Sequence, residues 1–170
     1  MKRLMNIAAV AGALAAVAVL LSCETLDYTN KYDARQKARG FIPEKVTSGM
    51  PEDRTQVPDG ARDVEWEQEG SFWKLSYEVG AGVNKVEYEV WFDSDGNWVK
   101  SQNDIRFADV PKYIKEYLDA DPVCSKATFE RDADYIERPS GVSYRFDGRV
   151  NGSDIDVEVT GDGTVTVFRD

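Results

Sequence analysis

One stretch of the sequence, VEYEVWFDSDGNW at residues 86–98, decides the fold. Its first seven residues alternate in polarity along an extended chain, which is the period of a half-buried strand. One side holds Val86, Tyr88, Val90 and Phe92. The other side holds Glu87, Glu89 and Trp91. The turn signal Ser94-Asp95-Gly96 follows, so the stretch predicts an antiparallel hairpin whose second strand begins near Asn97.

Two turn geometries fit this hairpin, and they place different tryptophans in the core. A two-residue turn at Asp95-Gly96 pairs Phe92 with Val99, whereas a three-residue loop ending in a left-handed Gly96 pairs Phe92 with Trp98. A shift of one residue moves every following side chain to the other face of the sheet. The register therefore decides which tryptophan faces outward.

A similar loop near the C-terminus favours the three-residue geometry. There, Gly161-Asp162-Gly163 pairs Val159 with Val165 and Val157 with Val167, whereas a two-residue turn would set these valines against Thr160 and Glu158. Applied to the first hairpin, this geometry predicts that Trp98 belongs to the core.

Trp91 is then the candidate functional residue. It lies on the face otherwise marked by charged side chains, with Val99 opposite and Phe72 nearby. An exposed tryptophan among charges is typical of a binding anchor, so these three residues form the predicted partner-binding site. The alternative is that the second half of the chain, or long side chains, cover the ring.

Alternation extends over most of the chain. Two earlier strands join the hairpin in a four-stranded meander, with apolar positions at Val64, Trp66, Trp73, Leu75, Tyr77 and Val79. Residues 109–118 then predict a short amphipathic helix, with Pro111 in its first turn. Further strands are predicted at residues 124–132, 142–150, 154–160 and 164–169.

The two halves share one plan. Sliding the sequence by 67 residues places Asp95-Gly96 on Asp162-Gly163, which indicates a duplication. The predicted fold is α+β, built of tandem helix-plus-four-stranded antiparallel units at residues 41–108 and 109–170, with the helices on one face of the sheet.

The N-terminus predicts an export signal. Lys2 and Arg3 precede an apolar run that ends at Ser22-Cys23, so residues 1–22 are predicted to be a signal peptide and residues 23–40 a tether. The segment LLSC at residues 20–23 resembles the lipobox of bacterial lipoproteins, which implies lipidation of Cys23. The alternative is a retained transmembrane helix, because 18 residues span about 27 Å.

Composition excludes several function classes. The 170 residues carry a net charge of −10, which becomes −12 when Lys2 and Arg3 leave with the signal, so a nucleic-acid partner is not expected. The sequence has no histidine, which excludes Ser-His-Asp and Cys-His catalysis and histidine metal sites. Lipidation of Cys23 leaves Cys124 as the single free thiol. Cys124 is expected to act as a small apolar residue at the start of a strand.

No metal or cofactor is expected. Asp93, Asp95 and Gly96 look like half of a calcium loop, but Trp91 occupies the first ligand position and Gln102 the closing one. With 31 acidic residues, some pair of carboxylates lies at catalytic spacing by chance, so spacing does not indicate a glycosidase. A plain hairpin turn is the expected role of residues 93–97.

The sequence resembles a known family. The stretches VPDGARDVEWE at 57–67 and YEVWFDSDGNW at 88–98, with Val110-Pro111 opening the central helix, resemble the PepSY-like family, itself described as similar to beta-lactamase inhibitory protein. The resemblance covers about residues 41–170 and implies a secreted or periplasmic non-enzymatic protein. In place of the family's regular first helix, the chain has the breakers Pro43, Gly49 and Pro51, which predict a short or broken helix.

These observations lead to one functional hypothesis and one rival. The hypothesis is a monomeric, non-enzymatic lipoprotein of the bacterial envelope, on the periplasmic face or the cell surface of the outer membrane. It would bind a protein or peptide partner through an open sheet face, with inhibition as one form of that binding. The rival is a structural or envelope-homeostasis lipoprotein without a dedicated ligand site.

Overall fold

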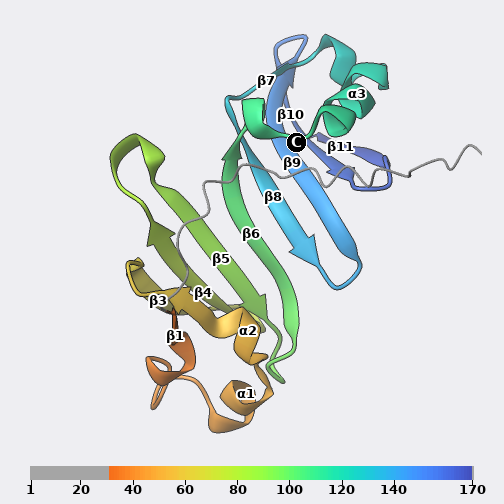
Figure 1. The fold of residues 1–170 in the computed structure, drawn as a ribbon. Helices are drawn as coiled ribbons and strands as arrows, with labels where there is room; N and C mark the ends of the chain where they lie inside the picture. The colour runs from red at the N-terminus through yellow and green to blue at the C-terminus, as the bar shows by residue number, and fades with distance from the viewer. Residues whose placement is uncertain (1–30, 170) are drawn as a thin grey trace, which may run out of the picture.

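A single large antiparallel sheet organises the molecule (Figure 1), which a computed structural model describes over residues 31–169. Its strands follow the order β11-β10-β9-β8-β6-β5-β4-β3, and β7 pairs with β9 beside this path. The strands are β3 (Arg62–Glu69), β4 (Phe72–Val79), β5 (Val86–Phe92), β6 (Trp98–Arg106), β7 (Thr128–Phe129), β8 (Asp132–Arg138), β9 (Gly141–Val150), β10 (Ser153–Thr160) and β11 (Val165–Arg169). The two halves therefore meet where β6 pairs with β8.

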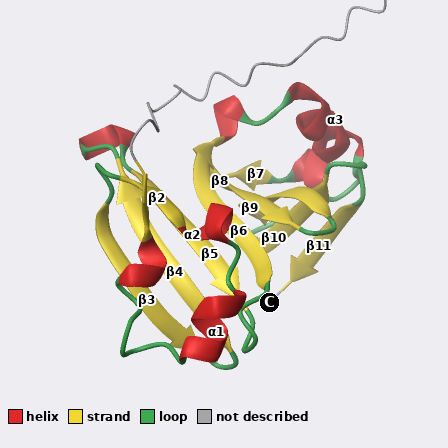
Figure 2. Ribbon diagram, turned by 60° about the horizontal axis from the view of Figure 1, so that its bottom comes forward, coloured by secondary structure: helices red, strands yellow, loops and turns green. Residues whose placement is uncertain are grey.

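The α-helices lie on one face of this sheet, which confirms the predicted α+β arrangement (Figure 2). They are α1 (Glu44–Gly49), α2 (Glu52–Thr55) and α3 (Lys112–Ala120). Within residues 31–169, four 3-10 turns accompany them: η1 (Ala34–Gln36), η2 (Gly82–Asn84), η3 (Phe107–Asp109) and η4 (Cys124–Lys126). Pro43 and Pro51 immediately precede α1 and α2, so the first helix is broken as predicted.

Each half has its own hydrophobic core between helix and sheet. In the first half, Val46 and Met50 pack with Trp73, Leu75, Val90 and Phe92. In the second half, Val110, Ile114 and Leu118 pack with Tyr144, Phe146, Val157 and Val159. The strand register carries the core-facing positions from one half into the other, because Tyr88, Asn103, Tyr135 and Tyr144 are successive cross-strand partners.

The three-residue loop is confirmed in both hairpins. Phe92 pairs with Trp98, and Val159 pairs with Val165. Gly96 has φ +86°, a conformation that favours glycine, and an added Cβ would lie 2.1 Å from the carbonyl oxygen of Val46. The turn thus packs its backbone directly on α1. Trp98 is partly buried against the first core, on the helix side as predicted.

The predicted tether is too long. Residues 31–40 belong to the first unit, where β1 (Lys31–Asp33) pairs with β2 (Gln56–Pro58) and Ala34 and Ala38 are completely buried. The Nε1 of Trp66 donates a hydrogen bond to the carbonyl oxygen of Ala34 at 3.1 Å. Two buried alanines in a polar stretch leave no hydrophobic period, which is why the segment resembles a linker in sequence.

The strand predicted at residues 124–132 is only partly present. Residues 124–126 form η4 instead of entering a strand, because Asp121 Oδ1 accepts hydrogen bonds from the backbone N–H groups of Val123 and Cys124. Within the predicted range, the structure has the two-residue strand β7, and the full-length strand β8 begins only at Asp132. Its alternation is hidden because Ile136 is buried on the face opposite the helices while Glu137 faces them.

Candidate protein-binding face

The sheet has a face without helices, called here the open face. Cross-strand partners point to the same side, so Lys74, Trp91 and Lys100 form one row across β4, β5 and β6 on this face. Glu67 of β3 continues the row as the partner of Lys74. The predicted candidate Trp91 therefore lies opposite the helices, as the hairpin register requires.

Two lysines flank the Trp91 ring. The Nζ atom of Lys100 lies 4.7 Å from the ring centroid, and that of Lys74 lies 5.4 Å from it. Both distances allow cation–π attraction. The ring is partly buried, and among the described residues its Nε1 is the buried side-chain polar atom without a hydrogen-bond partner. The two lysines thus lie over a tryptophan that is partly buried, whereas the sequence predicted it to be exposed.

Lys74 is held in a cage of carboxylates. Its Nζ lies 2.7 Å from Glu69 Oε1, 3.0 Å from Glu67 Oε2 and 3.3 Å from Glu89 Oε1, and 13% of its side chain is exposed. The hydrogen bond that it donates to Glu69 is the largest cause that raises the pKa of this ammonium well above its ordinary value. Lys74 is therefore a fully compensated cation.

Lys100 has a different environment. Its Nζ donates a hydrogen bond to Gln102 Oε1 at 2.9 Å, and within residues 31–169 it makes no ion pair. Desolvation by burial lowers its pKa. The charges of Glu89 and Asp134 oppose this shift in pKa, and those of Arg138 and Arg145 add to it. Among the described residues, Lys100 therefore lacks the direct ion pairs that Lys74 has.

Val99 does not lie opposite Trp91, in contrast to the sequence prediction. The register passes from Phe92–Trp98 to Trp91–Lys100, so Val99 is the extra residue of a β-bulge. A bulge adds one residue to one strand and cannot be read from alternation alone. Phe72, the third predicted site residue, pairs with Glu69 at the β3 edge and is 38% exposed.

The second half of the open face is dominated by carboxylates. Asp104, Asp134 and Arg145 are successive cross-strand partners, and Arg145 forms an ion pair with Asp156. Burial, followed by the charges of Asp104 and Asp147, raises the pKa of Asp134 to about 6. A depression of about 140 Å³ beside this region is lined by Glu87, Glu89, Gln102, Asn103 and Asp104.

The residues of the predicted hairpin turn form hydrogen bonds with one another. Asp93 Oδ1 accepts hydrogen bonds from the backbone N–H groups of Asp95 and Asn97, and Asp93 Oδ2 accepts from Asn97 Nδ2. Asp95 forms an ion pair with Lys45 of α1 at 2.5 Å. Across residues 31–169, no group of His, Cys, Asp or Glu has metal-binding geometry.

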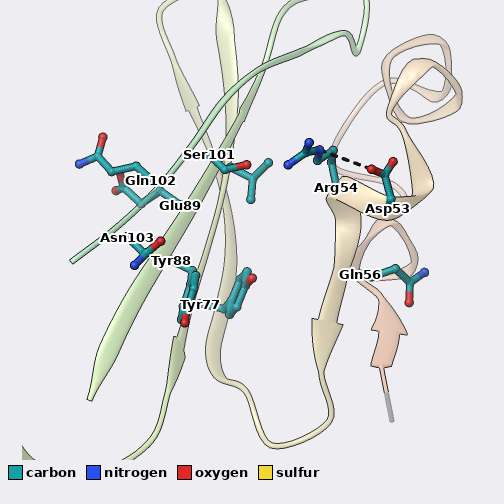
Figure 3. Close-up of a pocket in the computed structure, with 10 residues that line it drawn as sticks. Asp53, Arg54, Gln56, Tyr77, Tyr88, Glu89, Ser101, Gln102 and Asn103 are labelled. Atoms are coloured by element: carbon teal, nitrogen blue, oxygen red, sulfur yellow. Dashed lines mark ion pairs between the residues drawn. The ribbon is translucent and has the colours of Figure 1, made fainter. Parts of the chain in front are cut away.

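The helix side carries a second cleft, of about 200 Å³, which the sequence did not indicate (Figure 3). On the sheet side of the cleft, the rings of Tyr77 and Tyr88 stack with their centroids 5.2 Å apart. Arg54 and Gln56 lie across from them, on the α2 side. Arg54 forms two ion pairs at this cleft. Its Nε lies 3.4 Å from Asp53 Oδ2, and its Nη1 lies 2.8 Å from Glu137 Oε2. Only the packing of α2 onto the sheet brings these residues together.

The remaining predicted residues are two cysteines. Cys23 lies outside the described residues. Cys124 is buried, and desolvation raises its pKa to about 12, so its thiol is protonated at neutral pH. Within residues 31–169, no helix is long and apolar enough to cross a membrane.

Comparison with known proteins identifies the family. Residues 75–166, more than half of the chain, match the family described as "Putative beta-lactamase-inhibitor-like, PepSY-like", and the chain belongs to this family. No curated protein is similar enough in sequence to match the chain.

Solved structures share the fold at low sequence identity. A DUF2874 family protein from Bacteroides uniformis ATCC 8492 is 17% identical, covers 75% of this chain and 88% of its own, and has a TM-score of 0.57. A protein from Bacteroides eggerthii DSM 20697, described as a putative periplasmic protein, is 18% identical, covers 76% and 90%, and has a TM-score of 0.58. A BLIP-like protein from Bacteroides fragilis NCTC 9343 is 17% identical, covers 82% and 86%, and has a TM-score of 0.51.

Proposed function

We propose that this protein is a non-enzymatic lipoprotein of the bacterial cell envelope, anchored through Cys23, that binds a protein or peptide partner on its open face. Trp91, Lys100 and the exposed Phe72 are the contact residues of this proposal. The observation that carries it is the row of Lys74, Trp91 and Lys100 on a face that no helix covers. The protein acts as a monomer in this proposal.

The chemistry of the open face supports binding over catalysis. Its prominent groups are an indole and charged side chains engaged in ion pairs, and buried Cys124 lies in the core under the helix of the second half. A tryptophan held rigid by flanking side chains loses little conformational freedom when a partner covers it. The family's description, beta-lactamase-inhibitor-like, supports a protein as the partner and inhibition as one form of binding.

A pull-down with matched variants tests the binding proposal. The chain from Glu24 onward is immobilised by an N-terminal tag and exposed to an envelope extract of the source bacterium. Trp91→Ala should lose the captured partner, because a central tryptophan contributes about 2 kcal/mol or more to binding. Tyr113→Ala, a change at a 46% exposed aromatic on α3, should keep it. Capture that is equal for wild type and Trp91→Ala contradicts the proposal.

The anchor requires a separate test. Metabolic labelling with a fatty-acid analogue should mark the wild type and not Cys23→Ser, because the thiol is the acceptor in the lipobox-like segment. Equal labelling of both proteins would rule out lipidation at Cys23. The envelope location is supported by the periplasmic description of one structural neighbour.

A further inference from the structure

The two lysines that contact Trp91 are unequal in charge compensation. Lys74 contacts three carboxylates within 3.3 Å, whereas Lys100 bonds to the neutral amide of Gln102. Both lie in the same row of the same face, on either side of one ring. The two lysines therefore differ in charge compensation because of the side chains around them.

The surroundings of Lys100 do not supply the missing counter-charge. Glu89 and Asp134 both attract it from a distance, but Glu89 already contacts Lys74, and neither carboxylate forms an ion pair with Lys100 among the described residues. Arg138 and Arg145 both oppose its charge, and they bind Glu158 and Asp156 respectively. A half-buried ammonium near two guanidinium groups is unfavourable unless an anion joins it.

From this geometry we infer that Lys100, together with the Trp91 ring, forms a subsite for a carboxylate of the partner protein. The carboxylate is that of an Asp or Glu side chain, and an apolar neighbour of that residue rests on the indole. A charge-assisted hydrogen bond at a partly desolvated lysine is among the stronger polar contacts at an interface. This inference rests on the proposed function and names the chemistry of its partner.

The rest of the open face limits what else the partner carries. Glu87, Glu89 and Asp104 line the depression that also includes Gln102, the hydrogen-bond partner of Lys100. A run of acidic residues would meet this negative surface and be repelled. The matching segment therefore has a single carboxylate with neutral or basic residues beside it.

Two synthetic peptides test the inference without a known partner. The probes are acetyl-GFDGK-amide and acetyl-GFNGK-amide, which differ only in the charge of one side chain. Each is titrated into the isotope-labelled chain from Glu24 onward, and the Trp91 indole N–H signal is followed by NMR. The aspartate peptide should bind about tenfold more tightly than the asparagine peptide.

Matched lysine variants locate the preference. Lys100→Gln should remove the tenfold difference, and Lys112→Gln should preserve it, because Lys112 lies on α3 on the other side of the sheet and pairs with the exposed Glu116. The same spectra report whether each variant is folded. Equal binding of the two peptides, no binding of either, or equal sensitivity to the two substitutions would overturn the inference.

The partner pull-down separates this inference from the function beneath it. Loss of the partner with Trp91→Ala, together with full affinity for Lys100→Gln, would support the binding face and contradict the carboxylate subsite. Retention of the partner by Trp91→Ala would contradict the proposed binding face itself.

Discussion

Arg54 and Glu137 join the two halves of the molecule through a two-pronged ion pair. Arg54 Nη1 lies 2.8 Å from Glu137 Oε2, and Nη2 lies 2.9 Å from Oε1. The guanidinium also covers the Trp98 ring, 3.8 Å from its centroid. One side chain from α2 thus contacts the second-half strand β8 and the first-half strand β6.

Removal of this contact should measurably weaken the fold. Arg54→Ala is expected to lower the free energy of unfolding by about 1 to 2 kcal/mol, because it deletes a partly buried bidentate pair and a cation–π contact. Chemical denaturation of both proteins measures the difference. Lys112→Ala, which breaks the exposed pair with Glu116 on α3, is the control and should cost below about 0.5 kcal/mol.

The same pair gives a pH dependence of known sign. The hydrogen bond from Arg54 holds the pKa of Glu137 below its ordinary value of 4.5. A depressed carboxyl pKa contributes stability that is present above 4.5 and is lost as the pH falls through the folded-state pKa. The difference in free energy of unfolding between wild type and Arg54→Ala should therefore shrink in acid. A difference that is unchanged down to about pH 2 would contradict a stabilising role of the Arg54–Glu137 pair.

Gly96 should tolerate no side chain. Gly96→Ala combines a positive φ with a Cβ placed 2.1 Å from the carbonyl oxygen of Val46, so either the turn or α1 must move. We expect a loss of about 3 kcal/mol or more in denaturation experiments.

Gly40 provides the matched control for this substitution. It has φ +84°, against +86° at Gly96, but a Cβ added to it would have no atom within 4 Å. Gly40→Ala should therefore cost about 1 kcal/mol, which is the backbone strain alone. Equal losses at the two positions would mean that the contact between turn and α1 is unimportant.

Sequence patterns predicted the elements that bury one face. The alternation of residues 86–92 and the turn at Gly96 led to the correct register, and paired valines in the second hairpin chose between two turns. Three features escaped prediction because they depend on tertiary contacts. The buried alanines at 34 and 38 carry no period, Ile136 interrupts the charged face of β8, and the bulge at Val99 shifts one strand by one residue.

The candidate site was predicted only in part for the same reason. Alternation placed Trp91 on the open face, but it could not show that Lys74 is caged and Lys100 is not. That distinction depends on where Glu67 and Glu69 lie across from Lys74 on β3. Arg54 could not be assigned from sequence either, since its partner Glu137 is 83 residues away.

Asp134 should make the protein less stable as the pH rises through the weakly acidic range. Its pKa is raised from 3.8 to about 6, so the folded state holds the proton more tightly and loses stability between these values as the pH increases. Asp134→Asn should remove this slope and stabilise the protein at pH 7 by about 1 kcal/mol, a figure discounted for partial exposure. Asp119→Asn, at an exposed position on α3, should leave the slope intact.

Residues 31–40 should be required for full stability. A chain that begins at residue 41 lacks β1, exposes the sites filled by Ala34 and Ala38, and leaves the Trp66 indole N–H without its acceptor. We expect its Tm to fall by about 5 °C or more relative to a chain that begins at Glu24, because several buried contacts are lost together. The matched control begins at Lys31 and should melt with the longer chain. If the chain from residue 41 melts with the other two, residues 31–40 are a tether after all, and their packing contributes nothing to the fold.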